Sequence, residues 1–126
     1  MKFEEFIAQV AQEAGLPEED AATLTRATLA TLAERITGGE AQDLAAQLPL
    51  PLQNALISAH ENAEAFSYEE FVERTAERAG TDPDVAEIAI AAVFATLRDA
   101  VTPGEFDDVL SQLPAQFHRL GASRPL

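Results

Sequence analysis

Two polar stripes with the same spacing contain the residues of this sequence that are best suited to chemistry. Acidic and amide side chains recur at i, i+3 and i+7 in two places: Glu40, Asp43 and Gln47, and then Glu105, Asp108 and Gln112. On a helix this spacing places the members of each stripe along one face. If the two stripes face one another, their four carboxylates offer the oxygen ligands that a hard cation such as Mg²⁺ or Ca²⁺ prefers. They also suit a surface that recognises an arginine-rich partner.

The same residues have ready structural roles, and we favour those roles. Thr37 and Thr102 each precede a glutamate by three residues, so Glu40 and Glu105 are expected to complete capping boxes at two helix N-termini. The aspartates would interact with the helix dipoles, and the glutamines would bond the turn backbone before the proline that ends each stripe. The sequence therefore predicts no catalytic, cofactor or metal residue, and the six stripe residues are a speculative site.

The sequence lacks the residue patterns that several other kinds of active site require. The chain has no cysteine, which excludes disulfides and thiolate metal sites. Neither His60 nor His118 has a glutamate three or four residues before it, so the Glu-x-x-His signature of di-metal bundles is absent. We expect both histidines to be surface or packing residues. No serine lies in a Gly-x-Ser-x-Gly turn and no glycine-rich phosphate loop is present. We therefore expect a protein that is not an enzyme.

The charge balance excludes some partners. Twenty-two acidic residues against eight basic ones give a net charge of −14, and both halves of the chain are acidic. Such a field repels phosphate backbones and anionic lipids, so we expect no nucleic acid and no membrane as a partner. Solubility is the simplest interpretation of the charge; an acidic face for a basic protein, or mimicry of a nucleic acid, is the sharper one. The start of the chain does not resemble a signal peptide, and the apolar run 88–97 is too short to span a membrane, which predicts a cytoplasmic protein.

The chain contains an internal repeat. A shift of 65 residues aligns the two halves without a gap, with 18 identities over the 50 positions from Phe3 to Leu52. The identities fall where helices begin and end, as at Gly15 and Gly80. Repeats of this kind are typical of one supersecondary unit used more than once.

Each unit is predicted to contain three helices and a short fourth. Apolar positions 3, 6, 7, 10, 11 and 14 form one helical stripe that Gly15 ends, and second helices begin near Pro17 and Pro83. In the first unit, Arg26, Glu34 and Arg35 are expected to face outward. Third helices follow Thr37 and Thr102, and short fourth helices are expected at 52–57 and 115–120. The segment 88–101 is apolar on more than one side; we favour a place in the central core over half of a protein interface.

These patterns predict the fold class and its organisation. The fold is all-α, with two tandem copies of a three-to-four-helix unit packed into one pseudo-two-fold helical bundle. Residues 1–126 should form a single compact domain, with the first unit at about 1–57, a linker at about 58–65 and the second unit at about 66–120.

The motifs also resemble those of a known family. Phe-Glu-Glu-Phe at 3–6, Thr-Leu-Ala-Glu-Arg-Ile at 31–36 and the run 38–49 are similar to domain-of-unknown-function family 2267, as are Phe-Ser-Tyr-Glu-Glu-Phe at 66–71 and the run 104–114. The resemblance covers nearly the whole chain and implies a duplicated helical bundle of bacterial origin. It implies no activity, ligand or catalytic residue.

Three hypotheses for the function follow. The first is a non-enzymatic interaction or structural module that acts on a protein partner or on itself through its helical surface. The second, from a different class, is a small-ligand or divalent-cation site at the seam between the two units. The third and weakest is an acidic mimic of nucleic acid.

Overall fold

The computed structural model describes residues 1–57 and 61–120, and within these ranges the chain is helical with no strand. The first half contains α1 (Phe3–Ala14), α2 (Glu18–Arg35), α3 (Gly38–Ala45) and α4 (Leu50–Gln53), which a 3₁₀ turn over Asn54–Leu56 extends. The second half contains α5 (Tyr68–Ala79), α6 (Pro83–Ala100), α7 (Pro103–Ser111) and α8 (Gln116–Leu120). The all-α fold class is confirmed. The expected short helix at 52–57 begins and ends earlier and finishes as a 3₁₀ turn.

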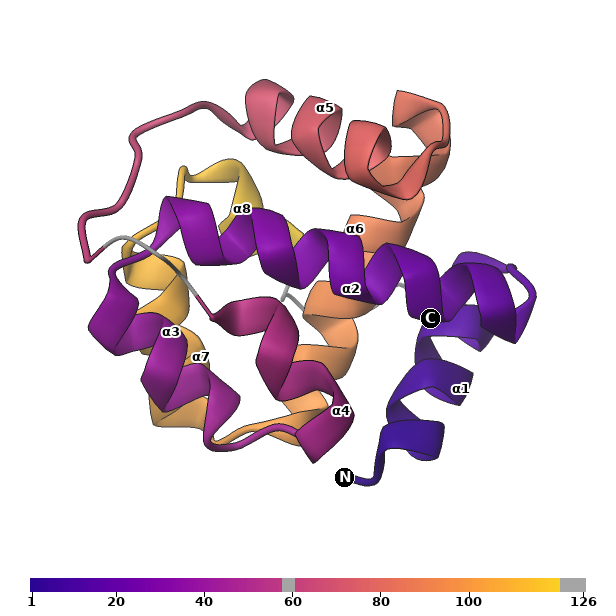
Figure 1. The fold of residues 1–126 in the computed structure, drawn as a ribbon, viewed down its shortest axis with the longest axis horizontal. Helices are drawn as coiled ribbons and strands as arrows, with labels where there is room; N and C mark the ends of the chain where they lie inside the picture. Colours follow the sequence, from indigo (N-terminus) through magenta and orange to yellow (C-terminus); the bar gives the residue numbers. More distant parts are fainter. Residues whose placement is uncertain (58–60, 121–126) are drawn as a thin grey trace.

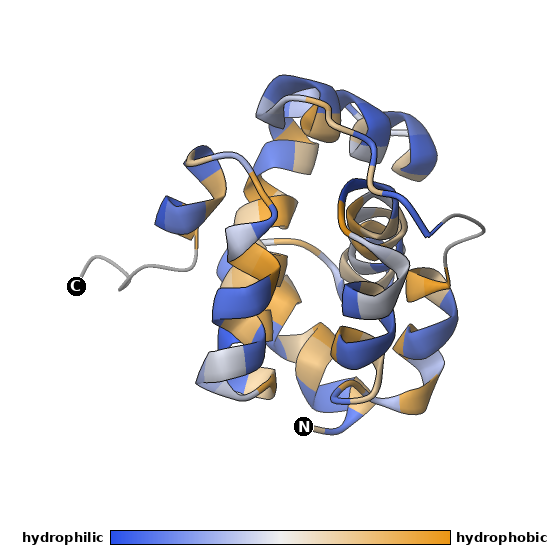
Figure 2. Cartoon of the chain, turned by 90° about the vertical axis from the view of Figure 1, so that its left-hand side faces the viewer, coloured by the Kyte–Doolittle hydropathy of each residue, from blue (hydrophilic) through white to orange (hydrophobic). Residues whose placement is uncertain are grey.

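The two long helices, α2 and α6, lie in the middle of the fold. Helix α1 packs on both of them, α5 covers α2 and α6, and α3 packs against α7 (Figure 1). One hydrophobic cluster contains buried residues from both halves of the chain, and its largest fully buried side chains include Phe6, Phe71, Phe94 and Phe117. Figure 2 shows the hydrophobic positions of the helices gathered toward the interior and the hydrophilic positions toward the outside.

Helix α6 is mostly interior, as the sequence predicts. Its buried positions run almost continuously from Ala89 to Leu97, because α1, α2 and α5 contact it from different sides. Ile88, the first residue of the apolar segment expected in the core, is instead 55% exposed. No helix in the described ranges combines the length and the apolar character that crossing a membrane requires.

The helix ends follow local rules that the sequence made visible. Gly15 and Gly80 end α1 and α5 with φ of 69° and 68°, a left-handed conformation that glycine adopts without a steric penalty. Thr37 and Thr102 cap α3 and α7: each Oγ1 accepts a hydrogen bond from the backbone amide three residues on, at 3.2 and 3.3 Å. These N-caps are confirmed.

The segment 61–67 has no helix and lies against the junction of α2 and α3. Its backbone accepts a hydrogen bond from the Gly38 amide at Glu61 (3.1 Å) and donates one from Glu64 to the Glu34 carbonyl (2.9 Å). A Cβ at position 38 would lie 3.1 Å from Oε2 and 3.3 Å from the Cα of Glu61, a tight contact that favours glycine here. Arg35, expected to face outward, instead donates to the carbonyl oxygens of Phe66 and Gln112, both at 2.9 Å. Its side chain therefore joins the two halves of the chain.

Candidate cation site

The two polar stripes lie on α3 and α7, which pack against each other. Thr37 and Thr102 place Glu40 and Glu105 in the first turns of these helices. The apolar neighbours Leu44 and Val109 are buried on the inner sides of the same helices, which fixes the direction of the polar faces. The packing therefore brings the two N-terminal turns together.

The glutamines of the stripes reach across from one helix to the other. The Thr37 amide donates a 2.8 Å hydrogen bond to Oε1 of Gln112, and the Thr102 amide donates one of 2.8 Å to Oε1 of Gln47. The amide groups of the same glutamines lie 3.5 and 3.4 Å from the two threonine hydroxyls. The expectation that these glutamines bond the turn backbone before the prolines is wrong. Each one caps the helix of the opposite half instead.

This exchange leaves the two expected capping boxes half formed. The threonine half is present, but the threonine amide, which Glu40 or Glu105 would have bonded, is taken by a glutamine from the opposite helix. Helix α5 also has only the N-cap half of a capping box: Ser67 caps the Glu70 amide, while the Glu70 side chain pairs with Arg74 at 2.9 Å. At α3 and α7 a glutamine from the opposite helix takes the place of the local glutamate, whereas at α5 an arginine four residues on in the same helix pairs with it.

The freed carboxylates form a cluster. One oxygen from each of Glu40, Asp43 and Glu105 lies within 4.8 Å of the other two. Glu105 is only 8% exposed, and the buried Oε2 atoms of Glu105 and Glu40 receive no hydrogen bond in the described part of the chain. The structure thus unites three of the four carboxylates that the sequence proposed. Asp108 is close enough to act on Glu105 through its charge but does not belong to this group of three.

Burial raises the pKa of Glu105 from about 4.5 to about 8, with further contributions from a hydrogen bond to Glu40 and from the charges of Glu40, Asp43 and Asp108. A carboxyl among carboxylates in a poorly hydrated site is stable only when a proton or another positive charge compensates it. Without a cation, Glu105 carries a proton at neutral pH. That proton allows it to bond Glu40.

Comparison with known proteins now gives the family. The family described as uncharacterized conserved protein DUF2267 matches residues 3–120. The chain is a DUF2267 protein. No curated protein matches it. The family description names no activity.

The cluster has the composition of a hard-cation site. All three groups provide carboxylate oxygens, the ligand type that Ca²⁺ and Mg²⁺ prefer, and nitrogen or sulfur ligands are not among them. Asp43 is exposed, which leaves one side open for water ligands. Glu105 forms the buried side.

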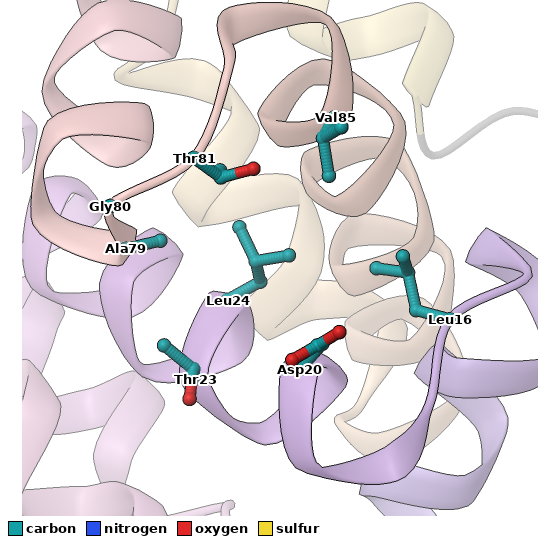
Figure 3. Close-up of a pocket in the computed structure, with 8 residues that line it drawn as sticks. All are labelled: Leu16, Asp20, Thr23, Leu24, Ala79, Gly80, Thr81 and Val85. Atoms are coloured by element: carbon teal, nitrogen blue, oxygen red, sulfur yellow. The ribbon is translucent and has the colours of Figure 1, made fainter.

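This DUF2267 chain also has a hollow away from the carboxylate cluster, lined by residues at the turn between α1 and α2 and at the turn between α5 and α6. It measures about 300 Å³, and Figure 3 shows its eight lining residues: Leu16, Asp20, Thr23, Leu24, Ala79, Gly80, Thr81 and Val85. Asp20 is its one charged group and is exposed. One solvated carboxylate does not select a ligand, so we place the candidate site at α3 and α7.

Sequence reasoning missed a charged network on the face between α2 and α5. Arg74 and Arg78 both pair with Glu34, at 3.1 and 2.7 Å, and Arg74 also stacks over the Phe66 ring with 3.9 Å to its centroid. Hydrogen bonding to Arg78 lowers the pKa of Glu34. No local pattern predicts these contacts between residues far apart in the chain. His118 is exposed, as expected, and His60 lies outside the described residues.

Proposed function

We propose that this protein is a non-enzymatic binding module that holds a hard divalent cation, Ca²⁺ or Mg²⁺, between α3 and α7. The ligands are Glu40, Asp43 and Glu105. One observation carries the proposal: Glu105 is more than nine-tenths buried, its Oε2 accepts no hydrogen bond from an N–H or hydroxyl group in the described ranges, and one of its oxygens lies within 4.8 Å of carboxylate oxygens of Glu40 and Asp43. A buried carboxylate oxygen without a donor is costly, and a cation shared by three carboxylates removes that cost.

The two-fold arrangement of the repeat units is part of the same proposal. Residues at equivalent repeat positions meet at both ends of the fold. The Thr37–Gln112 and Thr102–Gln47 bonds are equivalent under the 65-residue shift. Leu16 and Thr81, also equivalent, line one hollow. We infer that an approximate two-fold axis relates the units and passes close to the carboxylate cluster.

The test is calcium or magnesium titration of the purified protein, first stripped with a chelator, followed by calorimetry and thermal unfolding. A cation at a hundred times its Kd stabilises the folded state by about 2.7 kcal/mol, which for a chain of 126 residues raises the Tm by roughly 10 °C. Glu105→Gln with Asp43→Asn should abolish binding. Asp107→Asn removes an exposed carboxylate from the same helix and should leave binding intact. If neither cation shifts the Tm at millimolar concentration, the proposal is wrong.

Protein interaction, the first hypothesis from the sequence, stays a prediction. The apolar segment 88–101 would favour this hypothesis if it were exposed, but most of it is buried inside the chain. Two apolar residues that are exposed lie elsewhere: Leu50, 75% exposed, begins α4, and Ile57, 74% exposed, follows its 3₁₀ extension. Light scattering of the wild type and of Leu50→Ser with Ile57→Ser tests self-association: a monomer that the variant does not change would count against it. A cytoplasmic location is likewise a proposal.

A further inference from the structure

We infer that Gln47 and Gln112 are positioning residues of the cation site, which free Glu40 and Glu105 from helix capping and hold them opposite one another. This inference rests on the proposed function. The hydrogen bonds of these two side chains go to Thr37 and Thr102 and not to the three proposed ligands, so their role in cation binding is indirect.

The first step concerns what a glutamate does at the third position of a helix. Its side chain ordinarily returns to the amide of the N-cap residue. Helix α1 of this same chain shows the default: the Lys2 amide donates a 2.9 Å hydrogen bond to Oε1 of Glu5. At α3 and α7 the corresponding amides, those of Thr37 and Thr102, donate to glutamine at 2.8 Å. One N–H makes one strong hydrogen bond, so each glutamine displaces a glutamate from its usual partner.

The second step concerns where the displaced carboxylates go. Their Oε2 atoms are buried without a donor, and they lie with Asp43 in the cluster defined above. Each glutamine comes from the helix opposite to the amide it caps, so the two bonds also tie the N-terminal turns of α3 and α7 to one another. The same pair of contacts therefore frees the ligands and sets the distance between them. Groups that orient ligands in this way typically change metal affinity 10- to 100-fold when they are lost.

The experiment compares Gln112→Met, which keeps the length of the side chain but removes the acceptor, with Gln112→Glu, which keeps an acceptor oxygen. Calorimetry with Ca²⁺ should show 10- to 100-fold weaker binding for Gln112→Met and no weakening for Gln112→Glu. The matched control is Gln53→Met: it removes the hydrogen bond that the Gln53 side chain in α4 donates to the Leu48 carbonyl, which involves none of the proposed ligands. It should bind Ca²⁺ like the wild type.

A second measurement, on the cation-free protein, follows the Thr37 amide by NMR chemical shift and hydrogen exchange. When Gln112 is present, Glu40→Gln should leave the chemical shift and exchange rate of the Thr37 amide unchanged, because that amide is bonded to Gln112. The same change should alter it in the Gln112→Met background, where Glu40 returns to the amide.

The outcomes separate the two claims. Equal Ca²⁺ affinity of Gln112→Met and the wild type overturns the positioning role and leaves the proposed function standing. An amide that responds to Glu40→Gln in the wild type also overturns it. Absence of Ca²⁺ and Mg²⁺ binding in every variant overturns the proposed function and the positioning role together, and the amide data then show the exchanged caps to be structural only.

Discussion

Replacing Glu105 with glutamine should make the protein more stable at pH 7 and above, and this change tests the electrostatics of the cluster. Glutamine has nearly the shape of a protonated glutamate and cannot ionise. In the wild type, the pKa of Glu105 is raised to about 8 by burial and by Glu40, from a usual value of about 4.5. The folded protein therefore keeps a proton that the unfolded chain releases as the pH rises between these two values.

The sign and size of the effect follow from this difference. The stabilising contribution of the proton is complete below pH 4.5 and is lost as the pH rises to about 8. Between those limits the free energy of unfolding falls by at most about 1.4 kcal/mol per pH unit. The Glu105→Gln variant lacks this slope. Relative to the wild type it should therefore gain about 2 to 3 kcal/mol between pH 5 and pH 7.

The assay is urea unfolding followed by far-ultraviolet circular dichroism at pH 5, 6, 7 and 8, with EDTA present so that cations do not compete with the proton. Using the difference between variant and wild type cancels the titration of all other groups. Asp107→Asn serves as the control, because Asp107 is exposed on the same helix. Parallel curves for wild type and Glu105→Gln would refute the reasoning, because they would mean that Glu105 ionises normally in the folded protein.

Three further predictions concern the fold that holds the site, each measured as a urea midpoint. Phe94→Ala should cost about 3 to 5 kcal/mol, because this fully buried ring packs at the centre of the core. Gly38→Ala should lower the free energy of unfolding by about 1 kcal/mol, because the new Cβ would press on Glu61 in the linker. Gly39→Ala, which has open space at its Cβ, should be neutral or stabilising. Equal effects of the two changes would contradict the close approach at Gly38. Glu34→Gln should destabilise the protein at pH 7, and the loss should become smaller as the pH falls below 4.5, because the lowered pKa of Glu34 beside Arg78 gives stability that protonation removes. A loss that does not change with pH would count against this.

The sequence predicted the helix ends because those ends are decided by neighbouring residues. Gly15 and Thr37 act on backbone groups within four residues of themselves, so a one-dimensional pattern contains the whole interaction. The partners of Gln47 and Gln112 are not local. From the sequence alone, the nearest turn and the opposite helix are both acceptable partners. Only the approach of α3 to α7 decides between them.

The apolar helix shows the same limit. Ile88 and Ile90 are equally apolar, yet one is 55% exposed and the other is fully buried. A helix with two apolar stripes does not reveal how many neighbours surround it, and a small change in its rotation exchanges which positions are covered. The buried side chains of α6 are set by the joint positions of α1, α2 and α5. That arrangement depends on the whole chain.

The cluster also raises the question of why an acidic chain would bury a carboxyl between two helices. The N-termini of α3 and α7 carry partial positive charge and favour an anion in their first turns, which at α7 acts to lower the pKa of Glu105. The net shift at Glu105 is nevertheless upward, so burial and the neighbouring carboxylates outweigh the helix dipoles. A dipole also gives no directed donor to the two Oε2 atoms, because the amides of the N-cap threonines are already bonded to glutamine.

Two ways of satisfying these oxygens follow, a shared proton or a cation, and they differ in one measurable respect. Glu105→Gln preserves the proton-bonded form of the cluster and removes a charge from the cation-bound form. A variant that is stable at pH 8 and insensitive to Ca²⁺, beside a wild type that Ca²⁺ stabilises, would show that the charge of Glu105 is kept for the cation.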